Sequence, residues 1–128
     1  MAEYLLDTNI VIAFFAGDAE VKSQFASADK VGIPSIVLGE LYFGAEKSEQ
    51  VQQNITRTDD FASQIVVLAC DADTARWYGI VRNRLRVKGR PIPEGDIWIA
   101  AVALQYDMIL VTRDSHFNDV QDLKLERW

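Results

Sequence analysis

Four acidic residues in this chain are candidates for binding a divalent cation. Asp7 and Asp114 each follow a short apolar run that is typical of a buried strand, and Glu40 and Asp96 lie in apolar segments that are predicted to be helical. The carboxyl ends of parallel strands meet at one edge of a sheet, so Asp7 and Asp114 are expected to lie close together there. Helices packed above that edge can direct Glu40 and Asp96 at the same point.

Such a cluster supports metal-dependent hydrolysis. Four carboxylates without Lys or Arg partners repel one another, and a divalent cation removes that repulsion. Oxygen ligands with room for water suit Mg²⁺ or Mn²⁺ rather than zinc. One such ion lowers the pKa of a bound water, and two ions about 4 Å apart hold both the attacking and the leaving oxygen of a phosphodiester. The expected chemistry is hydrolysis of a nucleic acid.

Each candidate acid also has an ordinary structural interpretation. Asp7 fits a helix cap or a turn between a strand and a helix, and Thr8 and Asn9 are also good caps for the helix that follows. Asp96 is the expected N-cap of a buried helix. Glu40 fits a narrow solvent-exposed stripe on an otherwise apolar helix.

The remaining reactive residue types are assigned to packing and loops. We expect His116 to be a loop or packing residue and Cys70 to fill the core. Glu94 is interpreted as a loop residue and as a candidate supplement to the site. A single histidine and a single cysteine do not provide the usual ligands of a structural zinc site.

Short apolar runs alternate with longer segments of helical character. We expect strands at residues 4–6, 30–33, 64–68, 108–111 and 123–128. We expect helices, with their caps, at residues 9–15, 18–28, 35–45, 48–61, 71–87 and 96–106. The alternation predicts an α/β fold with a mainly parallel central sheet of four or five strands and helices on both faces. At 128 residues the chain is expected to form a single domain, residues 1–128.

Composition narrows the class of protein and its location. The hydrophobic share of 49% and the charged share of 25% are those of a globular protein. No apolar run approaches the roughly 20 residues of a membrane-spanning helix, and the start of the chain lacks the features of a signal peptide. The single cysteine suits a reducing compartment. We therefore expect a cytoplasmic protein with no membrane contact.

One strongly basic segment stands out in an acidic chain. The formal net charge of −6 argues against general binding of polyanions, which requires clustered Lys and Arg. Arg82, Arg84, Arg86, Lys88 and Arg90 nevertheless follow one another near the end of a predicted helix. Cations at a helix C-terminus are favoured by the helix dipole, so a solvated helix end is one interpretation. The other is that Arg82, Arg86 and Arg90 contact RNA or a protein partner.

The order of these motifs along almost the whole chain resembles that of PIN-domain nucleases, and more narrowly that of the bacterial VapC-type toxins. The matching segments are Leu5-Leu6-Asp7-Thr8-Asn9, residues 35–44 with Glu40-Leu41, residues 75–101 with Asp96, and Leu110-Val111-Thr112-Arg113-Asp114 followed by His116-Phe117. Each segment alone is a weak signal, and together they are specific.

The resemblance implies a fold, an activity and partners. It implies an endoribonuclease that depends on Mg²⁺ or Mn²⁺, forms a homodimer and is held by a cognate antitoxin whose tail blocks the acidic pocket. Asp7, Glu40, Asp96 and Asp114 match the metal-binding acids of the family, and Thr112 matches a polar position that supports the fourth acid.

Three other functions fit the residues less well. A phosphatase of the haloacid-dehalogenase type needs an acid where Asn9 stands and a Lys after residues 108–111, and neither is present. A phosphorelay receiver needs the same Lys, and Leu68-Ala69-Cys70-Asp71 is a poor version of its phosphorylation site. A non-catalytic PIN-fold scaffold has no need for a cluster of mutually repelling acids.

Overall fold

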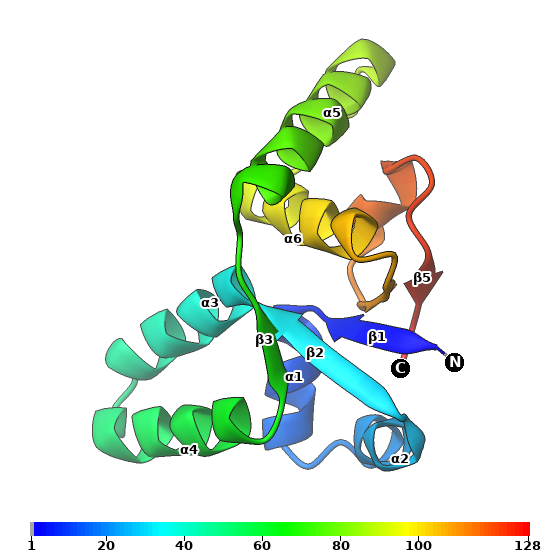
Figure 1. Ribbon diagram of the computed structural model, residues 1–128. Helices are drawn as coiled ribbons and strands as arrows, with labels where there is room; N and C mark the ends of the chain where they lie inside the picture. The colour runs from blue at the N-terminus through cyan, green and yellow to red at the C-terminus, as the bar shows by residue number, and fades with distance from the viewer. Residues whose placement is uncertain (1) are drawn as a thin grey trace.

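A five-stranded sheet forms the centre of the computed structural model, which describes residues 2–128 (Figure 1). The strands are β1 (Glu3–Leu6), β2 (Lys30–Pro34), β3 (Val66–Leu68), β4 (Ile109–Val111) and β5 (Leu125–Glu126). Their order across the sheet is β3-β2-β1-β4-β5, and every neighbouring pair is parallel. The predicted α/β fold with a parallel sheet is confirmed.

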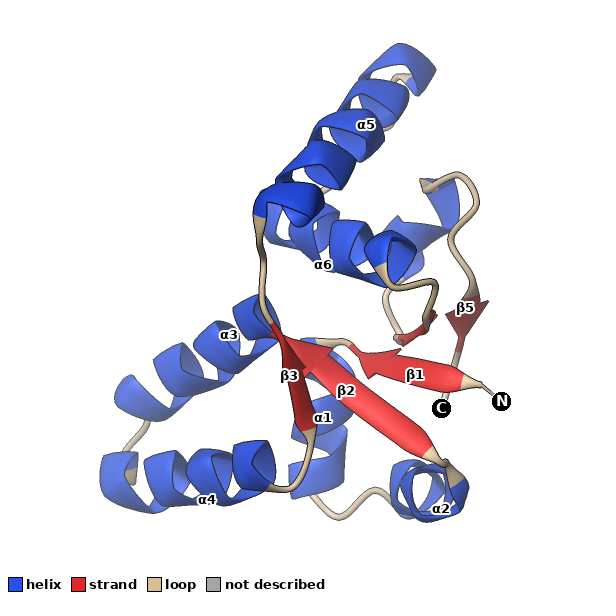
Figure 2. Ribbon diagram, viewed as in Figure 1, coloured by secondary structure: helices blue, strands red, loops and turns tan. Residues whose placement is uncertain are grey.

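Helices cover both faces of this sheet. They are α1 (Thr8–Phe15), α2 (Ala19–Ser27), α3 (Ser35–Glu46), α4 (Val51–Ser63), α5 (Ala72–Lys88), α6 (Glu94–Gln105) and the 3₁₀ helix η1 (Ser115–Asp119). Figure 2 shows α5 and α6 on one side of the sheet and α1, α2 and α4 on the other. Among residues 2–128, no helix has the length and apolar character needed to cross a bilayer.

The strand order reverses at β1. From β1 the chain passes through α1 and α2 to β2 on one side, and it returns much later through α5 and α6 to β4 on the other side. In open α/β sheets, ligands bind outside the carboxyl ends of the strands at such a point of reversal. Leu6 is paired with Val111, and the backbone N–H of Asp7 donates to the Val111 carbonyl at 3.0 Å. The residues that follow the two strands therefore lie side by side.

The apolar runs that predicted the strands form the core. Leu5, Leu6, Leu110 and Val111 have no exposed surface. Residues 99–103 of α6 are also buried, and three of these five residues are alanines. Small side chains let a helix approach a sheet closely, so α6 can lie directly over the central strands.

Three predicted helix starts are wrong: α4 begins at Val51 rather than Ser48, and α1 and α6 each begin earlier than predicted. Asp7, rather than Thr8 or Asn9, caps α1, because its side chain accepts a hydrogen bond from the Thr8 backbone N–H. Helix α6 begins at Glu94, two residues earlier than predicted, and the Pro93 carbonyl accepts the backbone N–H of Asp96. Proline is well suited to the start of a helix, where no N–H is needed. The side chain of Asp96 therefore has no capping role.

Cys70 is exposed and does not fill the core. It lies in the short link between β3 and Asp71, which caps α5 through a capping box with Thr74. A link of this kind runs over the surface because its backbone groups need water or side-chain partners. The last strand is also shorter than predicted, since β5 spans only two residues at the edge of the sheet.

Candidate active site

Asp7 is the most buried of the four candidate acids and is held by three donors. Only 4% of its surface is exposed. Its Oδ1 accepts the Thr8 backbone N–H at 2.8 Å, and its Oδ2 accepts the Thr112 hydroxyl at 2.8 Å and the Asn9 amide at 3.2 Å. Burial raises the pKa of Asp7 above its ordinary value of 3.8, and the charge of Asp114 acts in the same direction. The hydrogen bonds lower this pKa but do not offset the burial.

Asn9 and Thr112 connect the end of β1 to the end of β4. The Thr112 hydroxyl, besides donating to Asp7, accepts the backbone N–H of Asp114 at 2.9 Å. The Asn9 side-chain oxygen accepts the backbone N–H of Arg113 at 3.2 Å. These bonds fix the loop that carries Asp114 relative to Asp7. Asn9 and Thr112 thus contact the candidate acids directly, as does the backbone N–H of Thr8.

Glu40 reaches the same group from α3. It is exposed, as the solvent-stripe interpretation requires, yet partial burial of its carboxyl raises its pKa above the ordinary value of 4.5. The charges of Asp7 and Asp96 raise it further, while the nearby Thr8 side chain lowers it. The Thr8 hydroxyl oxygen is itself buried and has no hydrogen-bond partner of normal geometry within residues 2–128. A buried polar oxygen without a partner is uncommon in proteins, and here it borders the candidate acids.

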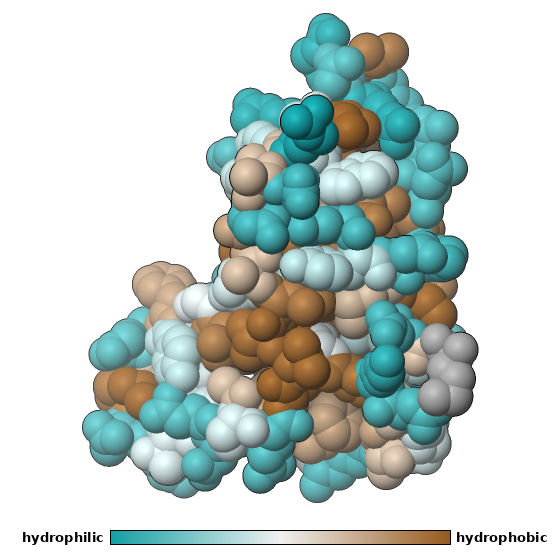
Figure 3. Space-filling model, viewed as in Figure 1, coloured by the Kyte–Doolittle hydropathy of each residue, from teal (hydrophilic) through white to brown (hydrophobic). Residues whose placement is uncertain are grey.

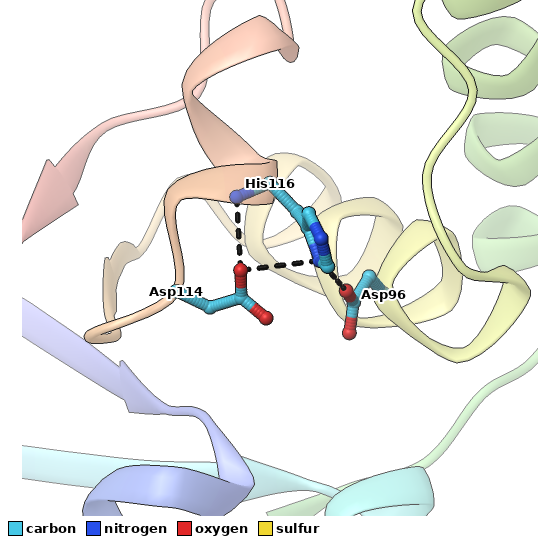
Figure 4. A group of neighbouring side chains, drawn as sticks. All are labelled: Asp96, Asp114 and His116. Atoms are coloured by element: carbon cyan, nitrogen blue, oxygen red, sulfur yellow. Dashed lines mark hydrogen bonds and ion pairs between the residues drawn. The ribbon is translucent and has the colours of Figure 1, made fainter.

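Asp96 and Asp114 meet across the ring of His116 (Figure 4). The His116 Nδ1 lies 3.2 Å from Oδ2 of Asp96 and 3.1 Å from Oδ1 of Asp114. The same Asp114 oxygen caps η1 by accepting the backbone N–H of His116 at 2.9 Å. Burial raises the pKa of Asp96, the charges of Asp7 and Asp114 add to this, and the contact with His116 opposes it.

The place of His116 differs from the one that the sequence predicts. Interpreting His116 as a loop or packing residue missed its position between two candidate acids. The sequence did contain one signal, which is that His116 follows Asp114 by two positions. An Asp that caps a short helix accepts the backbone N–H of the residue two positions later, which places that residue beside the Asp carboxylate. Asp96 comes from a different element, so the second contact is visible only in the fold.

Glu94 points away from this group. Its Oε1 accepts the Tyr78 hydroxyl at 2.6 Å and lies 3.7 Å from the Arg82 guanidinium on α5. It is therefore a partner of the basic segment rather than a supplement to the acids. The segment has a second acidic partner as well, since Arg84 lies 3.9 Å from Asp122.

Apart from the imidazole of His116, the candidate acids have no basic side chain beside them in the described part of the chain. Within residues 2–128, none of the four forms an ion pair with Lys or Arg. The raised pKa values of Asp7, Glu40 and Asp96 are the expected result of burying acids beside one another. A divalent cation fits this group on two grounds: its donors are mainly carboxylate oxygens, and the buried Thr8 hydroxyl borders it.

Almost the whole chain matches one known protein family. A family model described as the PIN domain matches residues 4–123. The chain belongs to the PIN-domain family. The reversal of strand order at β1, with Asp7 and Asp114 beside it, is where this PIN domain gathers its acids.

Relatives extend over the full length of this PIN domain. It is 39% identical to "Ribonuclease VapC2" of Haemophilus influenzae, with an alignment that covers 100% of this chain and 99% of the relative. It is 37% identical to the "tRNA(fMet)-specific endonuclease VapC" of Shigella flexneri over the same shares. Among solved structures, VapBC2 of Rickettsia felis, bound to a promoter DNA fragment, aligns with a TM-score of 0.91 and 32% identity, covering 98% of each chain.

Proposed function

We propose that this PIN domain is a metal-dependent endoribonuclease that hydrolyses RNA phosphodiester bonds and acts as the toxin of a toxin–antitoxin pair. One observation carries the proposal: four carboxylates that have no Lys or Arg partner among the described residues gather at the reversal point of the sheet, in a chain that is similar over its full length to VapC ribonucleases. A cluster of this kind favours a bound cation over any arrangement in which all four acids are ionised.

Asp7, Glu40, Asp96 and Asp114 would hold the cation, Mg²⁺ or Mn²⁺. When bound, it would lower the pKa of a water molecule and neutralise charge on the phosphate. The residues around the acids hold the carboxylates in position. Thr112 and Asn9 orient the Asp7 carboxylate and the backbone that carries Asp114. Glu40 is the most exposed of the four acids.

The basic segment is proposed to hold the RNA. A groove of about 600 Å³ runs between α5 and the start of α6, with Arg82, Asn83 and Arg86 on one wall and Pro91 and Ile92 on the other. The Arg86 guanidinium has hydrogen bonds only to the neighbouring Asn83 among the described side chains. Such a guanidinium is available for a phosphate, and its location on an acidic protein would confine the polyanion to this groove.

An antitoxin partner is supported by the solved relatives, which are VapBC toxin–antitoxin complexes. A homodimer is proposed from the family resemblance and from one surface feature. In Figure 3 apolar surface gathers over the region of β2 and β3, where Val66 is 60% exposed on the edge strand. Apolar surface beside an unpaired strand edge is typical of an interface. Action on RNA with an antitoxin partner would place the protein in the cytoplasm.

The test is cleavage of total RNA by purified protein, freed of any partner, with Mg²⁺ or Mn²⁺ and with EDTA. Asp96→Asn should lower the rate by at least about 100-fold, because a ligand of the cation loses its charge. Since Asp96 makes no capping bond, the variant should remain folded. Asp107→Asn makes the same chemical change just after the end of α6 and is the matched control, with activity expected near that of the wild type, because Asp107 is exposed and contacts Lys124 rather than the acids.

Discrete fragments that disappear with EDTA and in Asp96→Asn, but persist in Asp107→Asn, would support the proposal. RNA that stays intact with folded, metal-loaded protein would contradict it and favour a non-catalytic scaffold. Cleavage that survives EDTA would show that the acids are not the active site.

A further inference from the structure

We infer that His116 supplies a nitrogen ligand to the metal site and thereby makes the site select Mn²⁺ over Mg²⁺. The inference rests on the proposed metal-dependent function, and it concerns a residue outside the four acids. Three ligand atoms, one each from Asp96, Asp114 and His116, lie within 4.8 Å of one another. Figure 4 shows the imidazole inserted between the two carboxylates.

The spacing of these atoms is that of neighbouring ligands on one ion. Two adjacent ligands of an octahedral ion with bonds of about 2.1 Å are separated by about 3.0 Å, which is the bond length multiplied by the square root of two. The His116 Nδ1 lies 3.1 Å from the Asp114 oxygen and 3.2 Å from the Asp96 oxygen. The ring nitrogen therefore stands at the spacing of an adjacent ligand from each of the two carboxylate oxygens.

The fold also fixes the ring where it stands. His116 lies in η1, between Asp114, which caps this helix, and Phe117, which is fully buried in the core. The bond from the His116 backbone N–H to Asp114 locks the two residues together. The His116 side chain is half exposed, so water can complete the coordination shell around an ion held there.

A nitrogen ligand changes which ion is preferred. Mg²⁺ is a hard cation that takes oxygen ligands and keeps its water, whereas affinity for nitrogen sites rises along the transition-metal series that begins with Mn²⁺. Four carboxylates alone would discriminate weakly between Mg²⁺ and Mn²⁺. With the imidazole of His116 added, Mn²⁺ gains a favourable contact that Mg²⁺ uses poorly.

The decisive measurement is pulsed electron paramagnetic resonance of the Mn²⁺-loaded protein, prepared without a histidine tag. His116 is the only histidine in the chain, so an imidazole ¹⁴N coupling to Mn²⁺ can arise only from this residue. We expect the coupling in the wild type and its loss in His116→Gln. Absence of the coupling in the wild type would overturn the inference, whatever the variant does.

Affinities provide a second readout. His116→Gln should weaken Mn²⁺ binding by about 10-fold or more, the scale seen for changes around metal ligands, and should change Mg²⁺ binding by less than about 3-fold. Asn118→Ala, in the same 3₁₀ helix, is the matched control and should leave both affinities unchanged. If His116→Gln lowers the affinities for Mn²⁺ and Mg²⁺ by the same factor, the proposed selectivity is overturned.

The outcome is separable from that of the proposed function. RNA cleavage by a Mn²⁺-loaded protein that shows no ¹⁴N coupling would reject the role of His116 and leave the ribonuclease intact. A ¹⁴N coupling in a protein that leaves every RNA uncut would establish the ligand and reject the ribonuclease.

Discussion

The hydroxyl of Thr112 donates a 2.8 Å hydrogen bond to the carboxylate of Asp7, joining two strand ends that are 105 residues apart in the sequence. The same oxygen accepts the backbone N–H of Asp114 at 2.9 Å. One hydroxyl therefore sets the position of the buried acid and of the loop that carries a second acid. Its removal should affect both.

Thr112→Val is expected to lower both stability and activity. The substitution keeps the shape of the side chain but leaves the buried Asp7 oxygen with one donor fewer, at a cost of about 1–3 kcal/mol in the free energy of unfolding. Cleavage should fall at least about 10-fold, because Asp7 and Asp114 lose their shared support. Urea unfolding and initial cleavage rates measure the two effects.

Thr58→Val is the control for that substitution. Thr58 is also buried, and its hydroxyl donates to the Asn54 carbonyl within α4, away from the acids. It should lower stability and leave the cleavage rate of the folded protein unchanged. A similar loss of activity in both variants would show that Thr112 acts on the site only through global stability.

Without a metal ion, stability should decrease as the pH rises above the ordinary carboxyl range. Asp7, Glu40 and Asp96 have raised pKa values in the folded state, so the folded protein holds these protons more tightly than the unfolded chain does. Raising the pH from the ordinary values of 3.8 and 4.5 through the raised values removes those protons and lowers the free energy of unfolding. Above the raised values the loss is complete. Thermal unfolding in EDTA at pH 5 and at pH 7.5 tests this, and a saturating divalent cation should restore the stability lost at pH 7.5.

Asp7→Asn should stabilise the metal-free protein at pH 7.5 while it abolishes cleavage. Asparagine is also a good N-cap and removes the charge whose burial is unfavourable. We expect the melting temperature to rise by about 4 °C, the shift that about 1 kcal/mol produces in a domain of this size. The gain should shrink as the pH falls through the raised pKa of Asp7, where the wild-type carboxyl takes up its proton. A fall in melting temperature at pH 7.5 would contradict this prediction and show that the hydrogen bonds accepted by the Asp7 carboxylate outweigh the cost of burying its charge.

Binding of RNA should depend on Arg86 and Arg90 of the basic segment. In an Asp96→Asn background, which prevents cleavage, Arg86→Gln combined with Arg90→Gln should weaken RNA binding. The slope of the logarithm of the binding constant against the logarithm of the salt concentration should become shallower by about 0.7 for each phosphate that the protein no longer neutralises. Arg84→Gln is the control, because Arg84 already lies beside Asp122. If Arg84→Gln weakens RNA binding as much per charge removed as the double variant does, the effect comes from net charge and not from a defined groove.

Val66→Lys should disrupt the proposed homodimer. Val66 is 60% exposed on the edge strand β3, and a buried lysine at an interface loses hydration without gaining a partner. Light scattering should give a dimer mass for the wild type and a monomer mass for the variant. Val87→Lys, at a position that is 72% exposed near the end of α5, should remain dimeric. A wild-type protein that is monomeric would remove the basis for this interface.

The sequence alone determined the features that depend on local patterns. Short apolar runs that end in Asp7 and Asp114 predicted buried parallel strands, because a strand covered on both faces needs apolar side chains throughout. Alternation with helical segments then predicted the α/β fold, and the carboxyl ends of parallel strands share one edge whatever their order. These local patterns are sufficient to predict that Asp7 and Asp114 lie near each other.

Only the tertiary structure decided which side chains meet across elements. Glu94 and Asp96 are only two positions apart, and residues with this spacing on a helix point in nearly opposite directions. Glu94 therefore contacts Arg82 on α5. Asp96 contacts His116 on η1. The true start of α6 also removed the capping role that the sequence assigned to Asp96. Local periodicity specifies the face of a helix but not the element packed against it. The pairing of Leu6 with Val111 and the packing of α6 over β4 supply that information, and they bring His116 to the acids.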